Sequence, residues 1–217
     1  MPAVLLDFDG LILQTEASGF ASLQALFAAR GATYTLTDYL QIVGTSSGVL
    51  DPFLLLEQRT GRTWDRSAFD AERTAHEARL NEPLAPLPGV LDLLDAASAC
   101  GCALAVVSSS PHGWVDGHLH RLGLFGRFTT IVARGDAPQV KPAPDLYFEA
   151  LRRLEVTANE AVAFEDSYNG SLAAKRAGLR CVAVPHALTR SQDFSHCDLV
   201  VDSLASIDLA ALTQRLA

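Results

Sequence analysis

Residues 5–16 read LLDFDGLILQTE, an apolar run that ends abruptly in two carboxylates, Asp7 and Asp9. Carboxylates are among the side chains least often buried, so two of them at the tip of a hydrophobic strand need a reason. Residues two positions apart in an extended chain lie on the same side of it. The stretch therefore predicts a buried strand that delivers a pair of carboxylates to one functional site.

Further apolar or β-branched runs follow along the chain, and helical stretches separate them. Strands that are apolar throughout are typical of a parallel sheet covered by helices on both faces. The runs expected to form strands are residues 3–8, 103–108, 129–133, 161–166, 181–185 and 199–201. We therefore predict the α/β fold class, with a parallel sheet at its centre.

The segment between the first two strands has no strand signal and shows an apolar stripe at helical spacing instead. Within it, Asp51 followed by Pro52 is typical of a helix N-cap and first helical position. This segment is long enough for a small helical bundle. We predict a core formed by residues 1–14 and 86–217, with residues 15–85 inserted as a helical cap.

The composition limits the range of partners. The chain has 217 residues, with 17 Lys and Arg against 25 Asp and Glu, and a formal charge of −8. This charge repels nucleic acid and anionic lipid, so neither is an expected partner, and local cations or backbone amides must hold any anionic ligand. We find no leader pattern and no apolar run of membrane-spanning length, so we expect a soluble cytoplasmic protein, and a monomer at this size.

Chemically useful side chains follow the predicted strands. Ligands of an open α/β sheet bind beyond the carboxyl ends of its strands. Lys141 lies in a loop, VKPAPD, that two prolines restrict. The residues that follow the first, second and fourth runs are Asp7, Asp9, Gly10, Ser108, Ser109, Ser110, Glu165 and Asp166.

These residue types suit phosphoryl transfer. A carboxylate can attack phosphorus if a cation offsets the repulsion between the two anions. Glu165 and Asp166 supply the hard oxygen ligands that Mg²⁺ prefers, and Lys141 supplies a compact positive charge. Ser108 and Ser109 offer hydroxyl and amide donors for phosphate oxygens. The sequence therefore predicts a Mg²⁺-assisted site that binds a phosphate group.

Two carboxylates in one site can have different roles. We predict that Asp7 is the nucleophile, and that Asp9 protonates the leaving oxygen and later deprotonates the attacking water. Gly10, directly beside them, is predicted to bind the substrate phosphate together with Ser108, Ser109 and Lys141.

Several residues have a second interpretation that stays open. Ser109 and Ser110 could cap a helix instead of binding phosphate. Glu165 could support the metal site without ligating the metal. Trp64 and Trp114 are interpreted as packing residues, since large aromatic side chains most often fill a core.

Four motifs carry a resemblance to a known family. DFDGLILQTE, VVSSS, VKPAPDLYFEAL and FEDSYNGSLAAKRAG resemble, in order and spacing, the motifs of haloacid dehalogenase superfamily phosphatases with a helical cap after the first motif. The motifs extend from residue 5 to residue 178. The resemblance implies a Rossmann-like core, an aspartyl-phosphate on Asp7, and Asp9 as acid and base with its main-chain carbonyl on the metal.

The remaining motif residues also take roles by resemblance. The resemblance to the family implies that Ser108 and Lys141 bind the transferring phosphoryl group. It further implies that Asp166 completes the Mg²⁺ site, with Glu165 near it. The metal ligands expected are therefore Asp7, Asp9, Asp166 and Glu165.

Departures from related branches refine the expectation. The dehalogenase branch lacks the second Asp, because a halide leaving group needs no proton, so Asp9 favours phosphate esters. The β-phosphoglucomutase branch has a cap arginine where this chain has residues 45–47, and a hinge histidine where it has Ser18 and Gly19. Both differences favour hydrolysis. Gln14 stands where the family usually has Asp, at the hinge into the cap.

Taken together, these features predict a Mg²⁺-dependent phosphatase that acts on small phosphomonoesters such as sugar phosphates, beneath a cap that excludes bulk water. A phosphomutase similar to β-phosphoglucomutase remains the alternative within the enzymes. A non-catalytic protein that binds phosphorylated metabolites is the alternative outside them.

Overall fold

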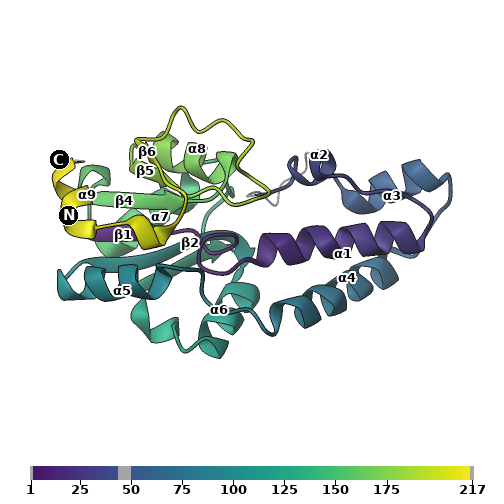
Figure 1. Cartoon of the computed structure of the whole chain (residues 1–217), viewed down its shortest axis with the longest axis horizontal. Coiled ribbons are helices and arrows are strands. Elements are labelled where there is room, and N and C mark those ends of the chain that lie inside the picture. The colour runs from purple at the N-terminus through teal and green to yellow at the C-terminus, as the bar shows by residue number, and fades with distance from the viewer. Residues whose placement is uncertain (1, 44–49, 216–217) are drawn as a thin grey trace.

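The structure, a computed structural model that describes residues 2–43 and 50–215, is built around a six-stranded parallel sheet (Figure 1). The strand order is β3-β2-β1-β4-β5-β6, and all neighbouring strands run parallel. The predicted α/β fold is confirmed, and every predicted strand is present. The strands are β1 (Ala3–Leu6), β2 (Ala103–Pro111), β3 (Thr130–Arg134), β4 (Ala161–Glu165), β5 (Arg180–Ala183) and β6 (Leu199–Val200).

Helices cover both faces of the sheet, as a parallel sheet requires. Residues of α5 (Val90–Ala99), α6 (His112–Arg121) and α9 (Leu209–Arg215) pack in one apolar cluster. Residues of α7 (Asp145–Leu154) and α8 (Tyr168–Arg176) pack in the other. Alternate residues of β1 belong to the two clusters, since successive strand side chains point to opposite faces. Both faces of the central strand are therefore buried.

Between β1 and the start of α5 lies a segment that we call the helical insert (residues 15–85), with four helices among its described residues. In Figure 1 its three longer helices extend away from the sheet, to the right. The helices are α1 (Thr15–Ala29), α2 (Leu36–Tyr39), α3 (Pro52–Thr60) and α4 (Arg66–Asn81). They share an apolar cluster of their own, formed by Leu23, Leu26, Phe27, Tyr34, Tyr39, Val43, Phe53, Leu56 and Phe69. The division of the chain into two domains at residues 14/15 and 85/86 stays a prediction.

The start of α3 confirms the local signal in the sequence. The Asp51 side chain accepts a hydrogen bond from the amide of Phe53 over 2.9 Å, and Pro52 is the first helical residue. Gly61 ends the helix with φ +64, a left-handed conformation that glycine adopts without a steric penalty.

Three short 3₁₀ segments complete the described elements, namely η1 (Phe125–Arg127), η2 (Ala158–Glu160) and η3 (Leu204–Ser206). Among the described residues, no helix combines the length and apolar character needed to cross a bilayer. Residues 45–47, on which part of the distinction from mutases depends, lie outside the described residues.

The second strand differs from its predicted bounds. It was expected to end at Ser108, and it continues to Pro111 with an irregular pairing to β3 between Val107 and Pro111. The three serines therefore lie in a distorted strand end, directly before α6. The other strand ends agree with the prediction within two residues.

Candidate active site

The carboxyl edge of the sheet gathers the predicted residues. Asp7 directly follows β1, Glu165 is the last residue of β4, and Asp166 follows it. Because β1 and β4 pair in register, with Leu6 opposite Phe164, these side chains meet at one edge. Lys141 reaches the same place from the loop between β3 and α7.

Lys141 is the centre of a buried ion-pair cluster. Its Nζ lies 2.5 Å from Oδ1 of Asp7 and 2.6 Å from Oε1 of Glu165, and only 1% of its side chain is exposed. The hydroxyl of Tyr147 donates a further hydrogen bond to Oε1 of Glu165. Burial alone would lower the pKa of Lys141, but Asp7 and Glu165 outweigh burial and raise that pKa. Lys141 is therefore a permanent cation at this site.

Three buried carboxylates lie together in this cluster, and two of them contact Lys141. Oxygens of Asp7, Glu165 and Asp166 lie within 4.8 Å of one another. Burial raises the pKa of Asp7 well above its ordinary value; Lys141 acts in the opposite direction, and the neighbouring carboxylates raise the pKa further. Burial likewise raises the pKa of Glu165 against the effect of Lys141. With every carboxylate ionised, the cluster carries two negative charges more than Lys141 neutralises.

This arrangement fits a hard divalent cation. Oδ1 of Asp166 is buried and has no hydrogen-bond partner among the described residues. An unpaired buried carboxylate oxygen is costly, and a divalent ion coordinated by oxygens would remove both that cost and the excess charge. The residues that could hold such an ion are Asp7 and Asp166.

Glu165 is placed differently from these two. Its Oε1 is taken by Lys141 and Tyr147. Its Oε2 points at Gly170, where a Cβ atom would approach it to 1.8 Å. This geometry favours the alternative left open in the sequence, in which Glu165 supports the site by holding Lys141.

The structure explains the glycine at position 10 in a way that differs from the predicted phosphate binding. Its amide already donates to the carbonyl of Leu13 over 2.8 Å. It adopts φ +83, and a Cβ there would lie 2.2 Å from Oδ2 of Asp166 and 2.9 Å from Nε2 of His186. The structure therefore favours a steric role, in which Gly10 leaves room for the Asp166 carboxylate.

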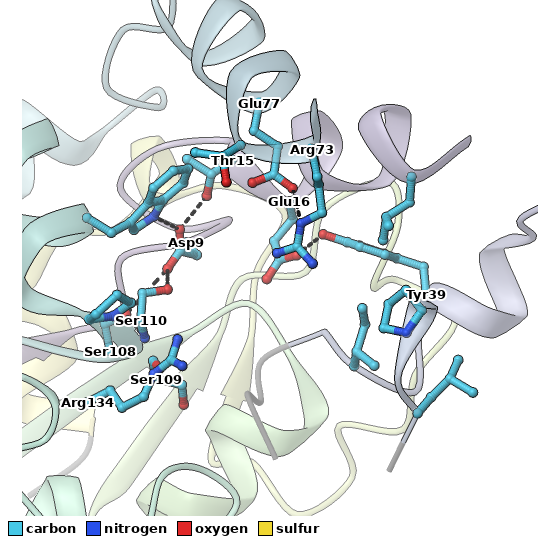
Figure 2. Close-up of a pocket in the computed structure, with 18 of the residues that line it drawn as sticks. Asp9, Thr15, Glu16, Tyr39, Arg73, Glu77, Ser108, Ser109, Ser110 and Arg134 are labelled. Atoms are coloured by element: carbon cyan, nitrogen blue, oxygen red, sulfur yellow. Dashed lines mark hydrogen bonds and ion pairs between the residues drawn. The ribbon is translucent and has the colours of Figure 1, made fainter. Parts of the chain in front are cut away.

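Asp9 lies outside the three-carboxylate cluster and accepts hydrogen bonds from four side chains. Oδ1 accepts from Thr15 over 2.6 Å and from Trp114 over 2.8 Å. Oδ2 accepts from Ser110 over 2.7 Å and from Ser108 over 3.3 Å. Figure 2 shows Asp9 at the end of the cavity where these donors converge. Its metal contact, expected through the main-chain carbonyl, stays a prediction.

The serines divide between two environments. Ser108 and Ser110 contact Asp9, and the amide of Ser110 also donates to Oγ of Ser108 over 3.0 Å. Oγ of Ser109 is buried without a hydrogen-bond partner among the described residues. The N-cap of α6 is Pro111, with no side-chain cap, so Ser109 and Ser110 are not its capping residues.

A cavity of about 600 Å³ opens above this edge, between the sheet and the helical insert. In Figure 2, Arg134 lies beside the serines, whereas Arg73 and Glu77 face the cavity from α4. Arg73 pairs with Glu77 over 2.9 Å. Arg134 donates from Nε to the carbonyl of Ser109 over 3.1 Å and has no ion pair within the described residues. Its guanidinium charge is therefore available to an anion.

Three functional candidates were missed in the sequence. Trp114 was interpreted as a packing residue; it does pack against the core, but it also binds Asp9. Thr15 and Arg134 were not identified at all. No local pattern marks Trp114 or Arg134, whereas Thr15 lies within the first motif and could have been a candidate partner of Asp9.

Gln14 occupies the hinge where the resemblance leads one to expect Asp. It is the N-cap residue of α1 but makes no capping hydrogen bond with its side chain. Its Oε1 is buried with no hydrogen-bond partner in the described part of the chain. Among the described residues, this oxygen therefore makes no hydrogen bond that would replace one of the usual carboxylate.

A parallel sheet that brings buried carboxylates and a lysine to one edge, beneath a helical insert, defines a class of Rossmann-like α/β enzymes. The chain belongs to the family described as haloacid dehalogenase-like hydrolase, which matches residues 4–184. The predicted family is confirmed, and the protein is therefore an enzyme of this family.

One relative and two solved structures show what the chain is similar to within and around this family. The chain is 39% identical to YhcW of Bacillus subtilis (strain 168), which is named as a candidate phosphatase, over 99% of this chain and 97% of YhcW. CbbY from Rhodobacter sphaeroides, solved in complex with phosphate, has a TM-score of 0.81 and 30% identity, with coverage of 98% of this chain and 99% of CbbY. β-Phosphoglucomutase from Clostridium difficile has a TM-score of 0.83 and 20% identity, with 100% and 97% coverage, and is similar in fold.

Proposed function

We propose that the protein is a Mg²⁺-dependent phosphatase that hydrolyses small phosphomonoesters through an aspartyl-phosphate on Asp7. The observation that carries this proposal is the contact between Asp7 and Lys141 inside a cluster of three carboxylates, of which Asp7 lines the cavity. A carboxylate held in one orientation by a buried cation is suited to attack a phosphorus atom. The relatives named as phosphatases support the same reaction class.

In the first step, an oxygen of Asp7 forms a bond to phosphorus while the ester P–O bond breaks. Asp9 donates a proton to the departing oxygen, so that an alcohol leaves. In the second step, Asp9 accepts a proton from a water molecule that attacks the same phosphorus. The Asp7–phosphate bond breaks, and inorganic phosphate is released.

Lys141, Ser108 and Ser109 are the proposed ligands of the transferring phosphoryl group. Lys141 offsets charge on the phosphoryl oxygens, where catalysis of phosphoryl transfer is concentrated. Oγ of Ser109 has a free hydrogen-bonding capacity for such an oxygen. Ser108 must exchange its present contact with Asp9 for the substrate.

Asp7 and Asp166 are the proposed side-chain ligands of Mg²⁺, together with the main-chain carbonyl of Asp9. When bound, the ion supplies positive charge that reduces repulsion between the nucleophile and the phosphate. Asp166 keeps one oxygen for this purpose, and Glu165 holds Lys141 in place.

The cavity suggests the substrate class. A volume of about 600 Å³ holds a small metabolite but not a folded phosphoprotein. Arg134 lines the cavity and has no ion pair with any described residue, which favours a substrate with a polar or anionic group beyond the transferring phosphate. We propose that the helical insert acts as a cap that closes on such a ligand and excludes bulk water.

The test is release of inorganic phosphate from p-nitrophenyl phosphate and a panel of sugar phosphates, with Mg²⁺ and after chelation. We expect Mg²⁺-dependent release by the wild type and none by Asp7→Asn. A beryllium trifluoride adduct on the Asp7 carboxylate would support the covalent route directly. Equal rates for the two proteins would overturn enzymatic action at Asp7, and full activity after chelation would overturn the metal site.

A phosphomutase remains the second candidate, since the fold also occurs in β-phosphoglucomutase. Gly19, one of the two residues where that branch has its hinge histidine, lies directly beneath the hydroxyl of Tyr39. A Cβ at this position would approach that hydroxyl to 2.8 Å. A larger side chain here would therefore have to displace the Tyr39 hydroxyl, which favours hydrolysis. Interconversion of sugar phosphates without phosphate release would decide for the mutase.

A further inference from the structure

His186 lies in the loop that follows β5 and contacts Asp166. Its Nε2 is 2.9 Å from Oδ2 of Asp166, and 11% of the histidine side chain is exposed. The contact occupies one oxygen of the carboxylate. The other oxygen, Oδ1, is the buried atom with no hydrogen-bond partner among the described residues.

The loop itself fixes the tautomer of His186. The amide of Leu188 lies 3.3 Å from Nδ1, and because an amide N–H only donates, Nδ1 accepts. The hydrogen of the neutral ring is then on Nε2, which donates to Asp166. The carbonyl of His186 accepts from Arg190 over 2.9 Å, and its amide donates to the buried hydroxyl of Thr189 over 3.1 Å. Hydrogen bonds within this loop therefore hold both the imidazole ring and the main chain of His186.

Gly10 packs directly against the contact between Asp166 and His186. Gly10 approaches both partners so closely that a Cβ atom would lie 2.2 Å from Oδ2 of Asp166 and 2.9 Å from Nε2 of His186. The carboxylate and the imidazole therefore lie packed between the turn after β1 and the loop after β5. This packing limits rotation of the Asp166 carboxylate.

The same loop contacts the helical insert. The side chain of Leu188 packs against the apolar cluster shared by the insert helices, although Leu188 belongs to the sheet side of the chain. Nearby, Nδ2 of Asn169, in α8, donates to the carbonyl of Val43 over 3.0 Å. Leu188, two residues after His186, thus anchors this loop to the helical insert.

We propose that His186 is a positioning residue that orients Asp166 toward the metal ion, and that Leu188 makes this orientation depend on the packing of the helical insert. The inference rests on the metal site of the proposed function. Hydrogen-bond partners of metal ligands fix ligand orientation, and their loss typically lowers metal affinity about 10- to 100-fold. A shift of the insert would then change metal affinity through a loop of three residues.

The first experiment measures Mn²⁺ affinity by electron paramagnetic resonance on the full chain without substrate. His186→Met removes the donor at similar volume, and His186→Gln retains an N–H donor. We expect the Met variant to bind Mn²⁺ at least about tenfold more weakly than the wild type, and the Gln variant to recover most of the affinity. Thermal unfolding of each metal-free variant identifies any that is misfolded.

A second measurement examines the tautomer directly. Long-range ¹H–¹⁵N correlation spectra of the metal-free wild type, recorded at a pH at which the ring is neutral, should show the hydrogen of His186 on Nε2. Unchanged affinity in the Met variant, or a hydrogen on Nδ1, would overturn the positioning role. A wild type that binds no Mn²⁺ would instead overturn the metal site, and with it the proposed function.

The coupling to the insert needs a matched pair of variants. Leu188→Ala removes the contact between the loop and the insert cluster, whereas Leu55→Ala, in α3, removes a contact with the same cluster from within the insert. We expect Leu188→Ala to weaken Mn²⁺ binding severalfold and Leu55→Ala to leave it unchanged. Equal effects of the two substitutions would overturn the coupling.

Discussion

The indole of Trp114 donates a hydrogen bond to Asp9, with Nε1 2.8 Å from Oδ1. Thr15 donates to the same oxygen, and Ser110 donates to the other. A carboxylate that accepts so many hydrogen bonds is held in one orientation. To protonate a leaving oxygen, Asp9 must carry a proton and exchange at least one of these contacts for the substrate. The donors around Asp9 therefore set the position of the proposed acid.

Trp114→Phe should test this positioning, because it removes the donor and keeps an aromatic ring. A hydrogen bond to a charged group is worth about 1.5–3 kcal/mol, so we expect kcat for alkyl phosphates to fall about tenfold or more. Hydrolysis of p-nitrophenyl phosphate should fall less, since its leaving group needs no proton. The measurement is the ratio of kcat/KM for the alkyl ester to that for the aryl ester.

The second tryptophan provides the control. Trp64 donates to Thr60 within the helical insert, so Trp64→Phe should leave that ratio unchanged. Asp9→Asn should lower the ratio most, with a loss on alkyl esters of about 10²-fold or greater. If Trp114→Phe slowed both esters equally, its contact would not act through the acid.

Asp7→Asn should stabilise the metal-free protein. Burial raises the pKa of Asp7 in the folded state above its value in the unfolded chain. A carboxyl group shifted this way stabilises the fold while it is protonated, and this stability is lost as pH rises through the folded-state pKa. The advantage of the variant should therefore grow as pH rises above about 4, the ordinary range of the group.

Urea unfolding at several pH values with a chelator measures this difference in the free energy of unfolding. Lys141 keeps Glu165 as a partner in the variant, so no buried cation is left unpaired. Added Mg²⁺ should reverse the order, because only the wild type then retains its full set of proposed ligands. A difference that does not change between pH 4 and 8 would contradict the electrostatic explanation.

Asp166→Asn and Glu165→Gln should separate metal binding from support of the lysine. Asp166 has a free buried oxygen, so its substitution should weaken Mg²⁺ binding at least about tenfold. Oε1 of Glu165 is occupied by Lys141 and Tyr147 and its Oε2 faces Gly170, so its substitution should lower kcat more than it changes the dissociation constant. Calorimetric titration with Mg²⁺ measures the constants, and the opposite order would make Glu165 the direct ligand.

The strand ends explain why much of the site could be predicted. Where an apolar run stops at a carboxylate, the carboxyl end of the strand can be identified in the sequence. Parallel strands bring their carboxyl ends to one edge of the sheet. Asp7 and Asp166 were identified this way, Lys141 was identified in a loop that two prolines restrict, and the resemblance of the motifs to a known family supplied the proposed roles. The family and the parallel sheet followed from the same pattern.

The side-chain partners could not be predicted, because they depend on packing between distant segments. Trp114 lies 105 positions from Asp9 in the chain, and nothing near either residue encodes their contact. Gly10 was expected to bind phosphate because it adjoins the carboxylates, whereas its required feature is the absence of a side chain beside Asp166. Such steric requirements become visible only in three dimensions.

Arg134→Ala should raise KM for anionic sugar phosphates, because Arg134 lines the cavity and has no ion pair within the described residues. A charge-assisted hydrogen bond of about 1.5–3 kcal/mol corresponds to an increase of about tenfold or more. Arg66 also lines the cavity, but it pairs with Asp51 over 2.8 Å, so Arg66→Ala is the matched control with a smaller expected effect. Steady-state kinetics across substrates with and without a second anionic group would measure both variants. An equal rise in KM for all substrates would mean that Arg134 contacts the transferring phosphate, whereas a rise confined to substrates with the second group would place it at the distal end of the substrate.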